Sequence, residues 1–425
     1  MRCNKKAQFL ILACIYQPVF AAETLEQVFV TALTNNQSLM ASRSYTQAAE
    51  QNVYSAKGQR LPQLTASAGY TQFNHDPTAK TEVNGGNVEF QVSEAGSANA
   101  QVMLSMPVFT SGRISHDIEA AEAASRAAMQ DEVTAELNIK WQMAQAFVAV
   151  FRAEKSLEVV NSHVKSLQAH SGDVKNLFEQ GMVARNDLLS VGVELSNAQQ
   201  AVLKAGNQLD LAKAHFNQLM NRDLAAEVDL VEYSPAILKG SFDALAKQAL
   251  QERPELKVLG EQGFALDQRA ASTEAGLWPQ LNISGGYQYQ QNSLQVYENM
   301  WSANATVNWK IYDGSTQHRS DELKFQSQAL VSQKNDLKNA IQLQVRSAWL
   351  SVQETVKRIE ISQQAIVQAD ENLKVSTERY QQGLANHTEV LDAENLRIRT
   401  HDNFNNARYD HSLANLLLRR AIGIL

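Results

Sequence analysis

Cysteine and proline are scarce in this chain of 425 residues, and so is positive charge. Both cysteines, Cys3 and Cys14, lie in the first 21 residues, so the rest of the chain has no thiol and no disulfide. No proline occurs between Pro107 and Pro235, or after Pro279. Because proline interrupts helix interiors, both of these stretches are free to form very long helices.

The first 21 residues are typical of a secretory signal peptide. Three basic side chains precede an apolar stretch at 7–20, and small residues stand at the cleavage position before Ala22. The mature chain is therefore expected to start at Ala22. In an alternative interpretation Cys14 is lipidated, since residues 11–14 loosely resemble a lipoprotein cleavage box, but almost no tether would remain before the helical pattern at Thr24.

The charge balance and the hydropathy exclude further classes of protein. The chain has 38 basic and 45 acidic residues, and removing the three basic residues of the signal leaves a net charge of −10. Nucleic-acid binding needs a basic surface and is therefore disfavoured. After the signal no apolar run approaches the ~20 residues of a membrane-spanning helix. If the mature chain lies in a membrane, it is expected to cross as strands.

Patterns for catalysis or metal binding are also missing. The nine histidines are scattered. His163 and His170 share a helix face without a carboxylate or thiol at ligand spacing, which favours a solvated face over a metal site. The chain contains no phosphate-binding glycine loop, nucleophile elbow or paired acid–base constellation. We therefore expect neither an enzyme nor a cofactor.

A duplicated coiled-coil pattern is the strongest feature that is present. Apolar or small residues recur at 4,3 spacing from Ile139 to Phe178. The same pattern recurs 202 residues later, from Ile341 to Tyr380. The pattern lasts six heptads, which indicates helices packed lengthwise in a rod or tube. The first set is Ile139, Met143, Ala146, Val150, Ala153, Leu157, Val160, Val164, Leu167, Ser171, Val174 and Phe178.

Two long helical hairpins are predicted from these sets. The first helices are expected at about 113–180 and 315–382, each on the order of 100 Å long at ~1.5 Å per residue. Returning helices are expected at about 187–219 and 388–423, and a short helix at 242–253. The predicted organisation is a signal peptide (1–21), a first repeat (22–221), a linker (222–241) and a second repeat (242–425), each repeat holding a helix, a β-hairpin and a long helical hairpin.

Four segments of about ten residues alternate between apolar and polar side chains, the length that a tilted strand needs to cross a bilayer. They cover about 64–71, 98–106, 282–290 and 301–311, and aromatic residues cluster towards their ends, as in interface girdles. The polar segments 74–97 and 291–300 are expected to be loops. A soluble sheet with one face on a core is the alternative, but no other segment is free to cover it.

Four strands cannot close a barrel, because the smallest bacterial barrels use about eight. An open edge in lipid leaves unpaired N–H and C=O groups, each of which costs several kcal/mol. Strands from several copies of the chain are therefore expected to share one barrel.

The chain resembles the outer membrane efflux protein family over essentially the whole mature sequence. Two ordered copies of short motifs carry this resemblance, together with Thr24–Val28 at the mature start, Val390–Ala393 and Asn406–Tyr409. The paired motifs are Leu61-Pro62-Gln63-Leu64 with Trp278-Pro279-Gln280-Leu281, and Phe178–Ala184 with Tyr380–Ala385.

The resemblance implies a homotrimer. Its β-barrel would have twelve strands, four per subunit, in outer-membrane lipid, and would continue into a periplasmic α-helical barrel of antiparallel coiled coils. Such a channel is the exit duct of a tripartite efflux or type I secretion system and conducts passively. An inner-membrane transporter supplies the energy and a periplasmic adaptor protein joins the two. Drugs, bile salts, metals and polypeptides all remain open as substrates.

By the same resemblance, the pore narrows at the periplasmic tip of the helices. Glu389 and Asp392 match two acidic ring positions, and Asp187 and Tyr380 match a pair that helps to hold the tip shut. The arginine of that contact falls at Ala385, so the closed tip is expected to be held differently here.

A structural role is equally open for the carboxylates. Asn186 and Thr388, again 202 apart, are predicted N-caps, which would place Asp187, Glu389 and Asp392 in first helical turns. There negative charge suits the helix dipole by ~0.3–1 kcal/mol. The two roles are compatible. For the whole protein, a structural coiled-coil or adhesin would explain the heptads but not the strands, and a lone porin the strands but not the helices.

Overall fold

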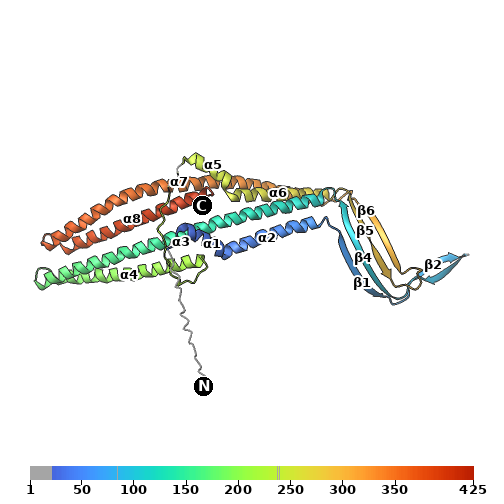
Figure 1. The fold of residues 1–425 in the computed structure, drawn as a ribbon, viewed down its shortest axis with the longest axis horizontal. Helices are drawn as coiled ribbons and strands as arrows, with labels where there is room; N and C mark the ends of the chain where they lie inside the picture. Colours follow the sequence, from blue (N-terminus) through green and yellow to red (C-terminus); the bar gives the residue numbers. More distant parts are fainter. Residues whose placement is uncertain (1–21, 84, 237, 239) are drawn as a thin grey trace, which may run out of the picture.

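The computed structural model describes residues 22–83, 85–236, 238 and 240–425. The predicted signal peptide, with Cys3 and Cys14, lies outside the described residues. The described chain is elongated, with a β-sheet at one end and the turns of two helical hairpins at the other (Figure 1). The short helices α1 (Leu25–Asn35) and α5 (Phe242–Glu252) lie near the middle.

The two long helices confirm the interpretation of the heptad sets. α3 covers Arg113–Glu179 and α7 covers Thr316–Gln381, 67 and 66 residues respectively. Their returning partners are α4 (Arg185–Leu219) and α8 (His387–Ala421), each of 35 residues. Two helices of 22 residues, α2 (Gln37–Gly58) and α6 (Pro254–Ala275), complete the half of the stalk next to the sheet.

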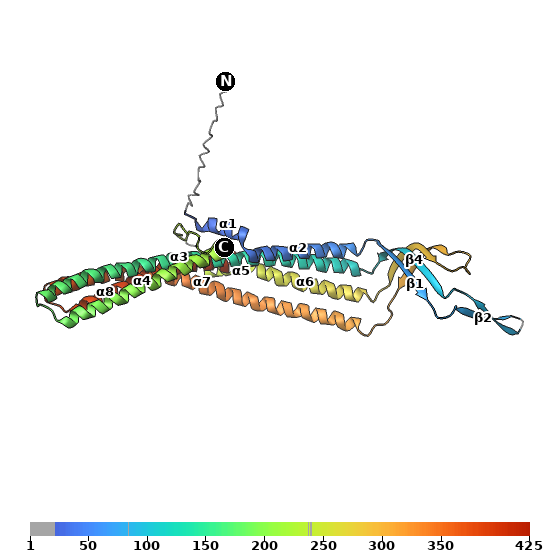
Figure 2. The same cartoon turned by 90° about the horizontal axis from the view of Figure 1, so that it is seen from below.

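The helices form a single curved layer. Near the sheet the neighbours are α2, α3, α6 and α7 (Figure 2). Towards the turns they are α4, α3, α8 and α7 (Figure 1). The 4,3 positions face these neighbours, since Ile341, Val345 and Ala348 of α7 are fully buried. Among the described helices, none is long and apolar enough to cross a membrane.

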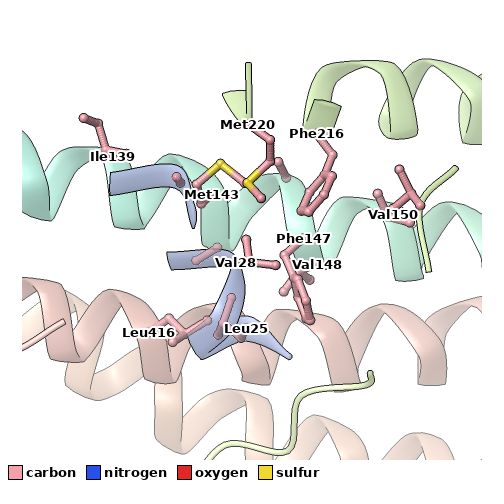
Figure 3. Packing of buried hydrophobic residues seen from close by; sticks show 14 of the residues in the cluster. Leu25, Val28, Ile139, Met143, Phe147, Val148, Val150, Phe216, Met220 and Leu416 are labelled. Atoms are coloured by element: carbon pink, nitrogen blue, oxygen red, sulfur yellow. The ribbon is translucent and has the colours of Figure 1, made fainter. Parts of the chain in front are cut away.

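The largest apolar cluster lies where the first helix meets both hairpins. Leu25 and Val28 of α1 pack against Met143 and Phe147 of α3, while α4 and α8 close the cluster from either side (Figure 3). Glu23, two residues before the start of α1, accepts two hydrogen bonds from the guanidinium of Arg222, at 2.6 and 3.0 Å. The start of the described chain is thus fixed to the middle of the stalk.

Four antiparallel strands form the sheet in the order β1-β4-β5-β6. β1 covers Gln63–Gln72, β4 Gly96–Phe109, β5 Gln280–Gln290 and β6 Asn299–Asn308. The final strand was predicted to extend to 311 but ends at Asn308, because its partner Gln280 is the first residue of β5 and no residue remains to pair beyond it.

The register separates the sheet into an apolar and a polar face. One row across all four strands is Ala66, Val102, Tyr287 and Trp301, and the adjacent row is Leu64, Leu104, Gly285 and Ala303. The alternate positions present mostly polar side chains, for example the row Gln63, Ser105, Ser284 and Asn304 next to the Leu104 row. Because side chains alternate along a strand, every apolar row lies on the same face.

A second hairpin occupies the segment predicted as the loop 74–97, so that prediction is wrong in part. β2 (Thr78–Val83) and β3 (Gly86–Gln91) pair with each other and project beyond the sheet (Figure 1). Gly85, with φ of 83°, lies in the turn between them. Nearly all of the hairpin is exposed, so its polar composition concealed the strands.

Candidate functional site

The turns at the far end of the hairpins have the same design. Gly181 and Gly383, 202 residues apart, adopt φ values of 73° and 72°, in the left-handed region that favours glycine. The N–H of Met182 then donates to the carbonyl of Leu177 at 2.9 Å, and the N–H of Leu384 to that of Arg379 at 2.8 Å. These contacts satisfy the last carbonyls of α3 and α7.

The predicted N-caps, Asn186 and Thr388, are wrong by two residues. The N-caps are Ala184 and Asn386, because a glycine turn lets the chain re-enter a helix three residues later. Asn386 accepts a hydrogen bond through its side chain from the N–H of Glu389, at 2.9 Å. Alanine has no such acceptor at 184. At that turn the carboxylate of Asp187 instead accepts from the N–H of Ala184, at 3.3 Å.

The three predicted carboxylates lie close to this end of the molecule. Glu389, in the first turn of α8, pairs with Arg379 of α7 at 3.3 Å. Asp392 was predicted in the same first turn, which is wrong, because it lies one turn later and is exposed. Asp187 faces His387 of α8, with 3.4 Å between the carboxylate and Nδ1. Sequence reasoning missed Arg379, whose only signal was a basic residue next to Tyr380 and before the glycine turn.

Tyr380 is buried between the two hairpins, whereas the three predicted carboxylates are partly or fully exposed. Its side chain packs with Val174, Val191 and Val390, one from each of the other helices of the two hairpins. Its hydroxyl is buried and has no hydrogen-bond partner among the described residues, so it does not bond to Asp187 within one protomer. Burial raises the pKa of Tyr380, and the charges of Asp187 and Asp173 raise it further.

Contacts between the α3–α4 hairpin and the α7–α8 hairpin form what we name the inter-hairpin interface. Gln381 donates to Asp173 at 3.2 Å, and His387 faces Asp187. Two further contacts of this interface involve His163 and His170 of α3.

His163 and His170 were predicted to lie on a solvated face, and this prediction is wrong. Nδ1 of His163 lies 3.3 Å from the buried carboxylate of Glu394 in α8. His170 is 6 % exposed, and its ring contacts that of Tyr380 with 5.1 Å between centroids. Each histidine directly precedes a heptad position, Val164 or Ser171. Curvature of the layer turns this flank towards the second hairpin, and a single helix's pattern does not reveal that neighbour.

The environment of His170 favours its neutral form. Burial lowers the pKa of His170, and the nearby His387 lowers it too, while Asp173 and Glu394 act in the opposite direction. Neither ring nitrogen has a hydrogen-bond partner among the described residues. In the same part of the chain no group of three His, Cys, Asp or Glu side chains is placed to hold a metal ion.

Solved outer-membrane proteins share this fold, an amphipathic four-stranded sheet at the end of a long helical stalk. VceC from Vibrio cholerae has the same fold, with a TM-score of 0.79 and 18% identity over 94% of this chain and 96% of that one. The open state of MtrE from Neisseria gonorrhoeae is similar too, with a TM-score of 0.75 and 18% identity over 94% of this chain and 88% of that one.

Among curated proteins, the outer membrane protein TolC of Vibrio cholerae is 23% identical over 417 residues, which are 95% of this chain and 91% of the relative. The family model described as outer membrane efflux protein matches residues 28–222 and 245–424. The chain therefore belongs to the outer membrane efflux protein family. It is an outer-membrane efflux channel protein that extends into the periplasm, and the family is a non-enzymatic class.

Proposed function

We propose that three copies of the chain form the exit duct of a tripartite efflux or type I secretion system. The sheets form a shared barrel of twelve strands in the outer membrane, and the stalks form a periplasmic tube. Substrates pass through it passively, while an inner-membrane transporter supplies the energy and a periplasmic adaptor protein connects the two. The halves of each protomer are two structural repeats, 22–221 and 242–425, joined by the linker 222–241.

The observation that carries this proposal is the separation of apolar and polar faces in a sheet with two open edges. In one protomer β1 and β6 each have a single neighbour. Pairing β6 of one copy with β1 of the next satisfies both edges, which lipid requires. The apolar rows then contact lipid and the polar rows line the interior.

Exposed apolar side chains on the outermost helices support the same assembly. Leu203 and Leu211 of α4 are 71 % and 70 % exposed, and Leu343 and Ile361 of α7 are 70 % and 68 % exposed. α4 and α7 are the two ends of the helical layer near the turns. Joining α4 of one copy to α7 of the next covers these residues and closes a tube.

The constriction of this duct is proposed to lie at the hairpin turns, where Asp187, Tyr380, Glu389 and Asp392 gather. Carboxylates from three copies at one level attract cations and repel anions. Arg379 offsets part of the charge of Glu389, whereas Asp392 is exposed. Asp392 is therefore expected to contribute more to ion selectivity than Glu389.

Planar-bilayer recordings on the purified trimer test the constriction. The double variant Glu389→Gln with Asp392→Asn is expected to lower the preference for cations while the trimer stays folded. Asp210→Asn, which removes an exposed carboxylate from α4 far from the turns, is the matched control. Selectivity that is the same in the double variant and in the wild type would remove both residues from the pore.

The second candidate function is a structural coiled-coil protein of the outer membrane without transport. It is favoured only by the length of the helices. A channel forms a detergent-stable trimer that conducts ions, and a deletion strain becomes sensitive to exported compounds. A water-soluble monomer without detergent would refute the channel and leave the structural role.

A further inference from the structure

We propose that the inter-hairpin interface is a pH-sensitive contact, in which neutral His170 holds the two hairpins together and its protonation separates them and widens the tip. This inference rests on the proposed channel function, since separation of the hairpins changes conduction only if the stalk is a duct. It assigns a regulatory role to a residue outside the expected constriction.

The geometry around His170 is unusual for a buried polar group. Buried side-chain nitrogens and hydroxyls nearly always have hydrogen-bond partners. Here both ring nitrogens of His170 and the hydroxyl of Tyr380 lack one among the described residues, although the two rings are in contact. The residues packed around Tyr380, Val174, Val191 and Val390, are apolar and offer none. The interface thus buries an imidazole, and among the described residues no hydrogen-bond acceptor is placed to receive an N–H from either of its nitrogens.

Titratable groups on α3 and α8 act on this imidazole, Tyr380 of α7 contacts its ring, and Asp187 of α4 acts on Tyr380 and faces His387. Protonation of His170 brings a positive charge near His387, which already faces Asp187. Asp173 attracts that charge, but its carboxylate accepts from Gln381 and lies on the same helix as His170. The full set is Asp173 on α3, Asp187 on α4, Tyr380 on α7, and His387 and Glu394 on α8, with Arg397 3.7 Å from Glu394.

The direction of the pH effect follows from burial. Burial lowers the pKa of His170 in the closed interface, and separation of the hairpins returns it towards the ordinary value near 6.5. Between the lowered value and about 6.5 the open form binds more protons than the closed form, so acid favours opening. Each unit of difference in pKa changes the opening equilibrium roughly tenfold per protomer.

Two other histidines contact carboxylates across the same interface. His163 faces the buried carboxylate of Glu394, and His387 faces Asp187, each across the two hairpins. His170 differs from both, because neither of its ring nitrogens has a hydrogen-bond partner among the described residues. Replacing His163 therefore removes a contact between the hairpins but leaves the buried imidazole of His170 in place.

Conductance of purified trimers in planar bilayers between pH 7.5 and pH 5 tests the inference. The wild type is expected to spend several-fold more time in wide conducting states at the acidic end. His170→Phe keeps a ring against Tyr380 but cannot take a proton, and it is expected to abolish the response. His163→Gln removes a contact of the same interface without altering His170, and it is expected to keep the response. His411→Gln is the matched control, because burial also lowers the pKa of His411 but its partner is Thr355, away from the turns.

The outcomes distinguish the two proposals. Trimers that conduct at no pH would refute the channel, and the pH-sensitive contact with it. Conducting trimers whose acid response persists in His170→Phe, or disappears equally in His411→Gln, would refute the contact and leave the channel. If His170→Phe misfolds, His170→Gln gives the same comparison, since glutamine also does not titrate.

Discussion

The two tip turns allow a reciprocal test of helix capping within one chain. Asn386 caps α8 through its side chain, whereas the equivalent Ala184 has no side-chain acceptor for α4. Both residues have extended backbones, with φ and ψ of −95° and 163° at Asn386 and −82° and 158° at Ala184. Asn386→Ala removes a cap and Ala184→Asn adds one, without a change in backbone geometry.

An N-cap of this kind contributes ~1 kcal/mol. Loss of the cap should therefore raise local opening of the first turn of α8 about fivefold, and gain of the cap should lower opening of the first turn of α4 by a similar factor. Hydrogen exchange measured by mass spectrometry on peptides covering 386–391 and 184–189 reports both effects. Each variant's unaltered turn is the internal control.

Opposite changes are expected at the two turns. Equal acceleration in both variants would mean that any substitution loosens the tip. No change in Ala184→Asn would mean that the N–H of Asp187, which already donates to the carbonyl of Ala184 at 3.2 Å, gains nothing from a side-chain cap.

Two further substitutions test the packing and the electrostatics of the stalk. Phe147→Ala removes a fully buried side chain from the largest apolar cluster. It should lower the free energy of unfolding by ~3–5 kcal/mol in denaturant titrations. A loss below ~1 kcal/mol would contradict the place of Phe147 in the core. Burial, with the charge of Glu232 nearby, raises the pKa of Tyr409 to about 12 from an ordinary value of about 10. The folded chain then keeps a proton that the unfolded chain loses, so this stabilisation is complete below pH ~10 and is lost as pH rises towards 12. Tyr409→Phe should show a smaller loss of stability over that range, and identical pH profiles would refute the assignment.

Much of the fold could be predicted because its periodicities are long and uninterrupted. Six heptads predict the buried side of α3 and α7, from Ile139 to Val174 and from Ile341 to Tyr380, although α3 also buries Phe147 and Val148 outside this set. Strict alternation likewise fixed the faces of the four sheet strands. Local errors arose where the signal was short. The turns at Gly181 and Gly383 moved both helix starts by two residues, and the exposed β2–β3 hairpin gave no burial pattern.

The candidate site could be located but not resolved from the sequence. The resemblance brought Asp187, Tyr380, Glu389 and Asp392 to one end of the molecule, and the structure places them there. The partners of these residues depend on packing between hairpins. His170 meets Tyr380 only because two helices more than 200 residues apart in sequence lie side by side, and neither helix's own pattern encodes that contact.

The connections between stalk and sheet are unequal. Only residues 110–112 join β4 to α3, and Ser111 donates to the carbonyl of Pro279 at 2.6 Å. Residues 309–315 join β6 to α7, a connection more than twice as long. Motion of α3 is therefore transmitted to the strands through a shorter connection than motion of α7. In the proposed duct, we expect opening of the periplasmic end to move α7 and the helix that follows it more than α3.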